Sequence, residues 1–314
     1  MADGMRSGLS SGAGAEMLVK DLNDHLILFF DGRNPDARRL TPEWNWQDDA
    51  AMNLGIATYA IHRGDEALVY DTFTSPDQAR RVRAHLEGRG VRRFTVVNSH
   101  WHLDHVGGNA AYQDAAIVAC ALTRDHLAKQ RAEIESGTLW GPPAIQPLAL
   151  PTRTFEGRLD LDVGGIRVEL HQVNIHSKDS TVLYLPADKA LLAGDTLEDT
   201  LTYMVEIEGL ADHVANLRKL REMDIEAIFP NHGDPAVIQG GGYGKTLIDA
   251  TIGYITRMVR RAHDEGCLNG TMEEYVQASA AKGWIHPFAP YRDVHQQNLK
   301  LVHDHYKDRP LPEL

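Results

Sequence analysis

The stretch NSHWHLDHVGGN at residues 98–109 is the part of the chain that decides how the rest is interpreted. It places four side chains of metal-ligand type within six positions: His100, His102, Asp104 and His105. In an extended or irregular loop, residues spaced by two project to one side, so the first three can face the same way. His105 breaks that spacing, and Gly107–Gly108 after it would permit the chain to turn. Neutral imidazole and carboxylate suit zinc, with iron and manganese as competitors, so this stretch predicts a metal site.

Three further residues of the same chemical type stand at the ends of predicted strands. His176 precedes the strand STVLYLP (180–186), Asp195 ends the strand KALLAGD (189–195), and His232 lies in IEAIFPNHGD (225–234). Each could be an ordinary loop or turn residue. Loops at strand ends are held by the rigid sheet behind them and often carry binding residues. Because these strands can pack beside the strand that delivers the first cluster, we expect the three side chains to join it.

Short apolar runs separated by turn signals predict strands at 25–30, 55–62, 66–72, 92–99, 117–120 and 166–173, in addition to the three above. Helices are expected at 75–90, with Ser75 as N-cap, and at 108–114, 123–136 and 211–224. Strands and helices followed by a second set of both predict a layered α/β (α+β) protein with two similar halves. From residue 244 the pattern becomes helical, at 246–266, 272–283 and 291–306.

Composition limits the classes of partner and site. The 44 acidic residues outnumber the 32 basic ones and give a net charge of −12, which argues against nucleic acid or an anionic membrane as partner. The two cysteines, Cys120 and Cys267, form no CxxC pair, so neither a thiolate zinc site nor a disulfide framework is expected. Residues 1–16 are rich in Gly, Ser and Ala and contain no apolar run of signal-peptide length. We therefore expect a disordered N-terminus and a cytoplasmic protein.

SHWHLDHVGG resembles the HxHxDH signature of the metallo-β-lactamase-fold superfamily, and the later His, GD and NHG follow in the order of that family. The resemblance covers residues 20–240 and implies a four-layer αββα sandwich. It places the catalytic domain at 17–243 and leaves 244–314 as a helical C-terminal extension.

The resemblance also implies a ligand set for two zinc ions per chain, with iron or manganese as other candidates. The first ion would take His100, His102 and His176, and the second would take Asp104, His105 and His232. Asp195 would bridge both ions. Asp71, at the end of LVYDT, would accept the other N–H of a ligand histidine, or else be a plain turn residue.

These features predict a dinuclear zinc hydrolase whose metal-bound hydroxide attacks an ester, lactone, thioester or amide of small size. Asp104 is expected to orient that hydroxide and to help move a proton to the leaving group. One alternative is a mononuclear iron oxidoreductase resembling persulfide dioxygenases, with His100, His176 and Asp195 as ligands. Another is β-lactamase-like activity, since HSKDSTVLYLP (176–186) resembles zinc β-lactamases, although their best-known subclass has cysteine where this chain has Asp195.

Substrate contacts follow less directly from the sequence. Aromatic side chains with polar tips suit small organic ligands, which makes five residues candidates for the pocket: Trp101, Tyr203, Tyr243, Trp284 and His286. Each could equally pack in the core. The last segment, 284–306, contains four histidines and is partly amphipathic. It could cover the active site, form a homodimer interface, or be an ordinary C-terminal helix.

Overall fold

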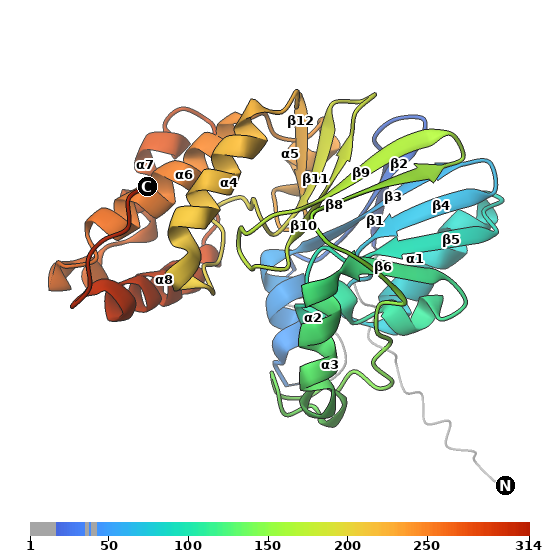
Figure 1. The fold of residues 1–314 in the computed structure, drawn as a ribbon, viewed down its shortest axis with the longest axis horizontal. Coiled ribbons are helices and arrows are strands. Elements are labelled where there is room, and N and C mark those ends of the chain that lie inside the picture. The colour runs from blue at the N-terminus through green and yellow to red at the C-terminus, as the bar shows by residue number, and fades with distance from the viewer. Residues whose placement is uncertain (1–16, 35–37, 39–42) are drawn as a thin grey trace, which may run out of the picture.

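The computed structural model describes residues 17–34, 38 and 43–314. The segment 1–16, predicted to be disordered, lies outside the described residues. Two β-sheets pack face to face in the middle of the molecule, and helices lie on their outer sides (Figure 1). This is the layered arrangement that the alternation of strand and helix patterns predicts.

The first sheet holds seven strands in chain order: β1 (Leu18–Asp21), β2 (Leu26–Asp31), β3 (Ile56–Arg63), β4 (Glu66–Tyr70), β5 (Arg93–Val97), β6 (Ala116–Cys120) and β7 (Arg153–Phe155). The pairs from β1 to β4 are antiparallel, and those from β4 to β7 are parallel. A tight turn joins β3 to β4, with Gly64 at φ +62°. The short edge strands β1 and β7 were not predicted, since neither is an apolar run.

The second sheet has the order β12-β11-β10-β9-β8. Its strands are β8 (Arg158–Val163), β9 (Ile166–Gln172), β10 (Thr181–Leu185), β11 (Ala190–Gly194) and β12 (Ala227–Pro230). Strands β8 to β11 pair antiparallel, whereas β12 runs parallel to β11 because α4 (Leu210–Glu222) connects them. Strand β8 was not predicted, although its sequence, RLDLDV, alternates charged residues with apolar ones as a half-buried strand does.

The two faces of the first sheet belong to different cores. On β2, Leu26 and Leu28 join the large cluster between the sheets, whereas Ile27 and Phe29 join the cluster beneath α1 (Pro76–Gly88). Successive side chains of a strand point to opposite faces, so a strand that is apolar throughout must be covered on both sides. Each fully buried side chain of this size contributes roughly 1.5–3 kcal/mol to folding.

At one edge, hydrogen bonds join the two sheets directly. The Tyr59 hydroxyl donates to the carbonyl of Pro230 and the Tyr70 hydroxyl donates to that of Thr181, both at 2.6 Å. The backbone N–H of Thr181 also donates to the carbonyl of Ser99 at 2.7 Å. The strand ends that carry the predicted ligands are therefore fixed to one another.

The chain after β5 differs from its prediction. Instead of a helix at 108–114 it forms the short α2 (Leu103–Val106) and a 3-10 turn, η2 (Asn109–Tyr112). Gly107 and Gly108 have ordinary negative φ values of −57° and −92°, so glycine is not needed here for a left-handed backbone conformation. A Cβ on Gly108 would lie 2.1 Å from the Thr72 carbonyl oxygen, and one on Gly107 would lie 2.3 Å from that of Thr74. Both positions require glycine because two backbone segments pass too closely for a side chain.

Other helices agree with expectation. Helix α1 begins after Ser75, whose hydroxyl accepts from the backbone N–H of Gln78, and α3 spans Ala121–Ser136. The π-helical turn η1 (Asp48–Leu54) was not predicted. Within the part of the chain that the structure describes, no helix is both long and apolar enough to span a lipid bilayer.

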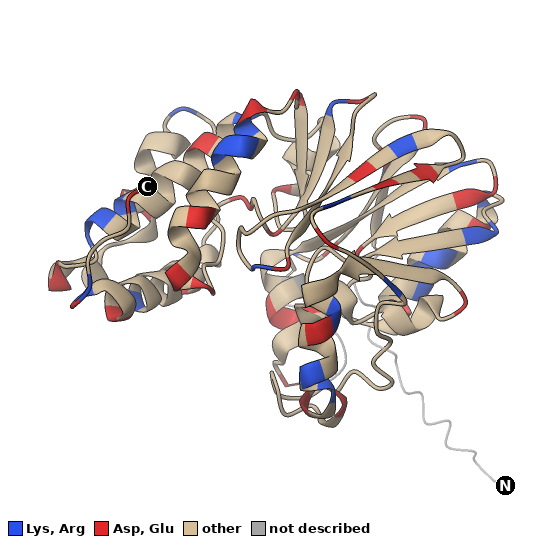
Figure 2. Ribbon diagram, viewed as in Figure 1, with Lys and Arg blue, Asp and Glu red and all other residues tan. Residues whose placement is uncertain are grey.

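The last part of the chain is helical, as predicted. The predicted helices are α6 (Thr246–Arg260), α7 (Met272–Ala280) and α8 (Tyr291–Tyr306). Three short elements were not predicted: η3 (Ile207–Gly209), which precedes α4, α5 (Pro235–Gln239) and η4 (Glu265–Asn269). In Figure 1, α6, α7 and α8 gather with α4 beside the second sheet. Their buried apolar residues, such as Tyr254, Leu299 and Val302, belong to the same cluster as the inter-sheet core. In the view of Figure 2, Lys and Arg are interspersed with acidic residues.

Candidate metal centre

Seven buried side chains of metal-ligand type converge where the strand ends of both sheets meet. His100 and His102 lie in the loop after β5, Asp104 and His105 lie in α2, and His176 lies between β9 and β10; Asp195 and His232 follow β11 and β12. They form two groups, in each of which one donor atom per residue lies within 4.8 Å of the others. The first group holds His100, His102, His176 and Asp195, and the second holds Asp104, His105, Asp195 and His232.

Asp195 belongs to both groups because one of its oxygen atoms occupies the centre. Its Oδ2 lies 3.0 Å from Nε2 of His105 and 3.7 Å from Nε2 of His100. The same oxygen lies 3.7 Å from Nε2 of His232 and 3.9 Å from Nε2 of His176. The bridging position that the family resemblance implies for Asp195 thus agrees with the geometry.

Two histidine rings are oriented by backbone carbonyls. Nδ1 of His232 lies 2.7 Å from the carbonyl oxygen of Gly55, and Nδ1 of His176 lies 2.8 Å from that of Tyr203. A carbonyl only accepts, so each ring carries a proton on Nδ1 and has its Nε2 on the side of Asp195; the neutral form of each ring is therefore the one protonated on Nδ1 alone. This is the tautomer that a metal ligand needs.

Asp71 orients a third ring and holds the loop around it. Its carboxylate lies 2.9 Å from Nδ1 of His105 and accepts from the backbone N–H of Ser99 and from Nδ2 of Asn231, both at 2.7 Å. Asp71 adopts a φ of +67°, an uncommon conformation that aspartate tolerates better than most residues. The structure therefore places Asp71 beside His105, which is one of the predicted ligands.

Two buried polar atoms without hydrogen bonds indicate whether the seven side chains suit a metal ion. Nε2 of His100 and Oδ1 of Asp195 are buried, yet neither has a hydrogen-bond partner. Such atoms are rare in proteins because their desolvation is costly, and a cation between them would satisfy both. Nitrogen and carboxylate oxygen donors suit zinc, iron or manganese.

The electrostatics point the same way. Burial lowers the pKa of His102 to about 3, with His176 adding to the effect, so the ring is a neutral donor. Burial opposes protonation of His232 as well, but Asp195 and Asp104 outweigh it and raise its pKa to about 9. The two buried carboxylates thus attract positive charge to the second group, where a cation would replace the proton.

Comparison with known proteins agrees with this geometry. A family model described as Metallo-beta-lactamase superfamily matches residues 53–232. The chain belongs to the metallo-beta-lactamase superfamily. Among solved structures, a metallo-beta-lactamase from Pontibacter korlensis superposes with a TM-score of 0.56 and 16% identity, covering 77% of this chain and 99% of that one. Another, from Hirschia baltica, gives 0.55 and 17%, covering 76% and 97%. At these identities the likeness confirms the metallo-β-lactamase sandwich fold alone.

Curated relatives in the superfamily carry diverse names. The alpha subunit of 2,4-dinitroanisole O-demethylase from Nocardioides sp. (strain JS1661) is 31% identical over 56% of this chain and 52% of its own length. Linear primary-alkylsulfatase from Pseudomonas sp. (strain ATCC 19151) is 26% identical over 56% and 41%. Atrochrysone carboxyl ACP thioesterase from Aspergillus fumigatus is 26% identical over 59% and 52%. This chain therefore spans about half the length of the relatives it matches.

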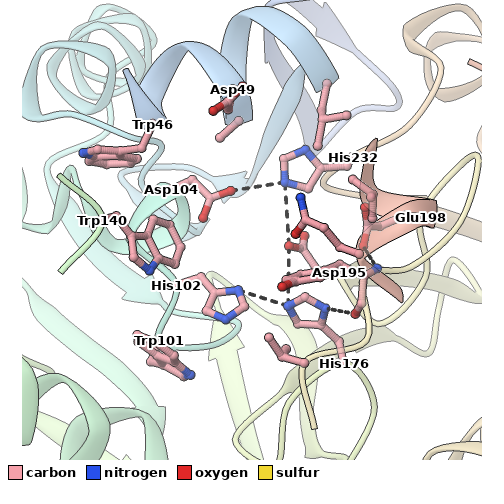
Figure 3. A pocket seen from close by; sticks show the side chains of 16 residues that line it. Trp46, Asp49, Trp101, His102, Asp104, Trp140, His176, Asp195, Glu198 and His232 are labelled. Atoms are coloured by element: carbon pink, nitrogen blue, oxygen red, sulfur yellow. Dashed lines mark hydrogen bonds and ion pairs between the residues drawn. The ribbon is translucent and has the colours of Figure 1, made fainter. Parts of the chain in front are cut away.

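A cavity of about 400 Å³ opens onto the donors (Figure 3). Its polar lining comprises His102, Asp104, His176, Asp195, His232, Asp49, Glu198, Tyr203 and Gln297. Its apolar lining comprises Trp46, Ala50, Leu54, Trp101, Trp140, Val205 and Val294. Two of the five predicted pocket residues, Trp101 and Tyr203, are among them.

The other three predicted pocket residues do not line this cavity. The Tyr243 hydroxyl donates to the buried carboxylate of Asp199 at 2.8 Å, and Nδ1 of His286 lies 3.0 Å from it. The ammonium of Lys282 lies over the ring of Trp284, 4.1 Å from the centroid of that ring. His286 thus joins the helical extension to Asp199 in the segment after β11, and the polar tips of Tyr243 and His286 are used in packing.

Sequence reasoning missed nine of the sixteen lining residues, and four of those nine carry an indole ring or a carboxyl group. Trp46 and Trp140 lie in segments whose sequence has neither strand nor helix periodicity. A large aromatic side chain in such a segment needs a tertiary contact, and this was the only feature of the sequence that could have indicated their place in the cavity. Asp49 follows in the unpredicted η1. Glu198 is buried, and burial raises its pKa to about 8, with the charge of Asp195 adding to the effect.

Proposed function

We propose that this protein is a dinuclear zinc-dependent hydrolase that acts on a small organic ester, lactone, thioester or amide. One observation supports this most directly: a single carboxylate oxygen, Oδ2 of Asp195, lies within 3.9 Å of two histidine nitrogens in each buried donor group, beside a cavity of about 400 Å³. Family membership and the names of the relatives support hydrolysis as the reaction class.

In this proposal the first zinc ion is held by His100, His102 and His176, the second by Asp104, His105 and His232, and both by Asp195. When bound, such a pair lowers the pKa of water toward neutrality and polarises the bond to be cleaved. The protein contributes rigidity, since the carbonyls of Gly55 and Tyr203 and the carboxylate of Asp71 fix three of the rings.

Asp104 has the best position for proton transfer. It lines the cavity, and its Oδ2 lies 3.3 Å from Nε2 of His232 and 3.4 Å from Nε2 of His105. Burial opposes ionisation, but His105 and His232 outweigh it and hold the pKa of Asp104 well below its usual range. Its carboxylate would therefore orient the attacking water and carry a proton toward the leaving group.

Metal analysis combined with turnover tests the proposal. We expect two zinc ions per chain and chelator-sensitive hydrolysis of chromogenic esters, lactones or thioesters. His100→Ala and Asp104→Ala should each lose bound zinc and reduce turnover by on the order of 100-fold or more. His263→Ala, at an exposed histidine far from the donors in sequence, is the control and should change neither quantity. Full metal content and full turnover in both site variants would refute the proposal.

The mononuclear iron alternative is separated by the same metal analysis. One iron per chain, with oxygen consumption in place of hydrolysis, would favour it. The complete second group of donors supports two ions instead. A β-lactam in the substrate panel tests the lactamase alternative. A homodimer formed through the C-terminal helices and a cytoplasmic location remain predictions, and the first is testable by sedimentation.

A further inference from the structure

The cavity beside the donors has an aromatic side that the hydrolytic chemistry does not require. We call Trp46, Trp101 and Trp140 the tryptophan wall; all three lie on the same side of the cavity in Figure 3. The ring of Trp140 packs edge-on against that of Trp46, with centroids 5.8 Å apart, and lies 6.3 Å from that of Trp101. It also lies 5.5 Å from the ring of His102. The wall thus begins at the predicted metal ligands and extends away from them.

The wall is anchored on one side and open on the other. Trp46 is 8% exposed, and its indole N–H donates to the carbonyl of Pro143 at 3.0 Å. Trp140 remains 38% exposed although its neighbours are aromatic. An exposed indole beside a cavity leaves a large apolar face in water, which a flat ligand would cover favourably. Leu54, Val205 and Val294 supply apolar contacts elsewhere in the same cavity.

Apart from the three histidines that would bind the metal ions, no side chain in the described lining is of a basic type. Asp49, Asp104, Asp195 and Glu198 line the cavity, and no Lys or Arg is found among its lining residues in the described ranges 17–34, 38 and 43–314. Asp104 and Asp195 would bind the metal ions, so an anionic group placed away from those ions would lose its hydration beside Asp49 and Glu198 and would find no Lys or Arg in the described lining. Sites that recognise carboxylates usually supply Arg or Lys for this purpose.

We infer that the substrate carries an uncharged aromatic ring, which stacks on the tryptophan wall, and that substrates with a negative charge on that ring are disfavoured. This inference rests on the proposed hydrolase function and names the substrate class within it. The cavity volume of about 400 Å³ lies in the range typical of small-molecule sites.

A matched pair of aryl acetates provides the test. The neutral member is 4-(methoxycarbonyl)phenyl acetate, and the anionic member is 4-carboxyphenyl acetate, which has nearly the same shape. After correction for their reactivity toward hydroxide, the zinc-loaded protein should show a kcat/KM at least about tenfold higher for the neutral ester.

Two variants, each with a matched control, test whether the residues that line the cavity cause the preference for the neutral ester. Trp140→Leu should lower kcat/KM for the neutral ester by about tenfold with unchanged zinc content, whereas Trp284→Leu, outside the cavity, should not. Gln297→Lys adds an ammonium to the exposed rim and should raise kcat/KM for the anionic ester severalfold. Gln277→Lys adds the same charge to an exposed position of α7 and should leave the ratio unchanged.

The outcomes separate this inference from the proposed function. Hydrolysis of both esters at equal efficiency, or faster hydrolysis of the anionic one, overturns the inference and leaves the hydrolase in place. An unchanged kcat/KM in Trp140→Leu also overturns it. If the protein with two zinc ions hydrolyses no ester, lactone, thioester or amide, the proposed function fails and the inference fails with it.

Discussion

At the scale of single residues, Asp71 shows how much one side chain organises. Its carboxylate contacts the ring of His105, the backbone of Ser99 and the amide of Asn231, so it ties the first sheet to the loops that bear the ligands. Its φ of +67° is the cost of that position, about 1 kcal/mol or more for a residue with a Cβ.

Asp71→Asn should therefore weaken metal binding without removing a ligand. Asparagine tolerates the left-handed conformation, but its amide cannot replace both oxygens as acceptors. We expect a loss of about 10- to 100-fold in affinity for one of the two zinc ions, measured by competition with a chromogenic chelator. Asp65→Asn, in the β3–β4 turn, is the control. Equal zinc affinity in Asp71→Asn and the wild type would contradict this role.

His213 governs a pH response in α4. Burial lowers its pKa to about 4 from 6.5, with His176 adding to the effect, and its Nε2 lacks a hydrogen-bond partner. Between those pH values the folded state binds fewer protons than the unfolded state. The stability that depends on the neutral ring is thus complete above pH 6.5 and is lost as the pH falls toward 4.

Replacement by leucine removes this titration. Between pH 7 and pH 5 the unfolding free energy of the wild type should fall by about 2 kcal/mol more than that of His213→Leu. Urea denaturation at both pH values measures the difference. If the two proteins lose the same free energy over this interval, the ring of His213 is protonated as easily in the folded state as in the unfolded one.

At the scale of elements, α8 supports the segment that orients one predicted ligand. The Asn298 side chain accepts from the backbone N–H of Met204 at 2.8 Å and donates to the carbonyl of Thr202 at 3.0 Å. Between them lies Tyr203, whose carbonyl holds Nδ1 of His176. A helix of the C-terminal extension therefore supports the candidate metal centre through two hydrogen bonds to the segment that orients His176.

Asn298→Ala should loosen this support. We expect kcat to fall by about tenfold and the affinity for one zinc ion to decrease, with KM changed less. Lys300→Ala, on the exposed face of the same helix, controls for general effects on α8. A variant with normal kcat and normal zinc affinity would show that the backbone of residues 202–204 holds its position without Asn298.

The turn between α2 and η2 depends on close backbone approach. Because a Cβ on Gly108 would lie 2.1 Å from the Thr72 carbonyl oxygen, Gly108→Ala must displace one of the two segments. We expect a destabilisation of about 3 kcal/mol or more in thermal or chemical unfolding. Gly88→Ala, whose Cβ would meet nothing within 4 Å, is the control. A cost below about 1 kcal/mol for Gly108→Ala would mean that these segments separate easily.

At the scale of the whole molecule, the helical extension shares its core with the sandwich. Tyr254 of α6 and Leu299 of α8 belong to the same apolar cluster as Leu183 and Leu192 of the second sheet. The boundary between a catalytic domain at 17–243 and an extension at 244–314 was drawn where the sequence pattern becomes helical, whereas the apolar cluster continues across it. We propose that the two parts fold as one unit.

Calorimetry tests this proposal on the full chain. A single cooperative transition is expected, with the van't Hoff enthalpy equal to the calorimetric one, because separating the extension would expose the shared cluster. Two resolved transitions would show that residues 244–314 are an independent domain. Chelated and zinc-loaded protein should both give one transition, with the loaded form melting at a higher temperature.

The layered fold and the seven residues that converge could be predicted from the sequence alone. Apolar periodicity reports which faces are buried, and His or Asp at several strand ends reports ligand chemistry at one sheet edge; both signals are local in the chain. The tryptophan wall, the support from Asn298 and the reason for the paired glycines could be recognised only in the folded chain. Each of these depends on contacts between loops or helices far apart in sequence, where packing, not local pattern, selects the neighbours.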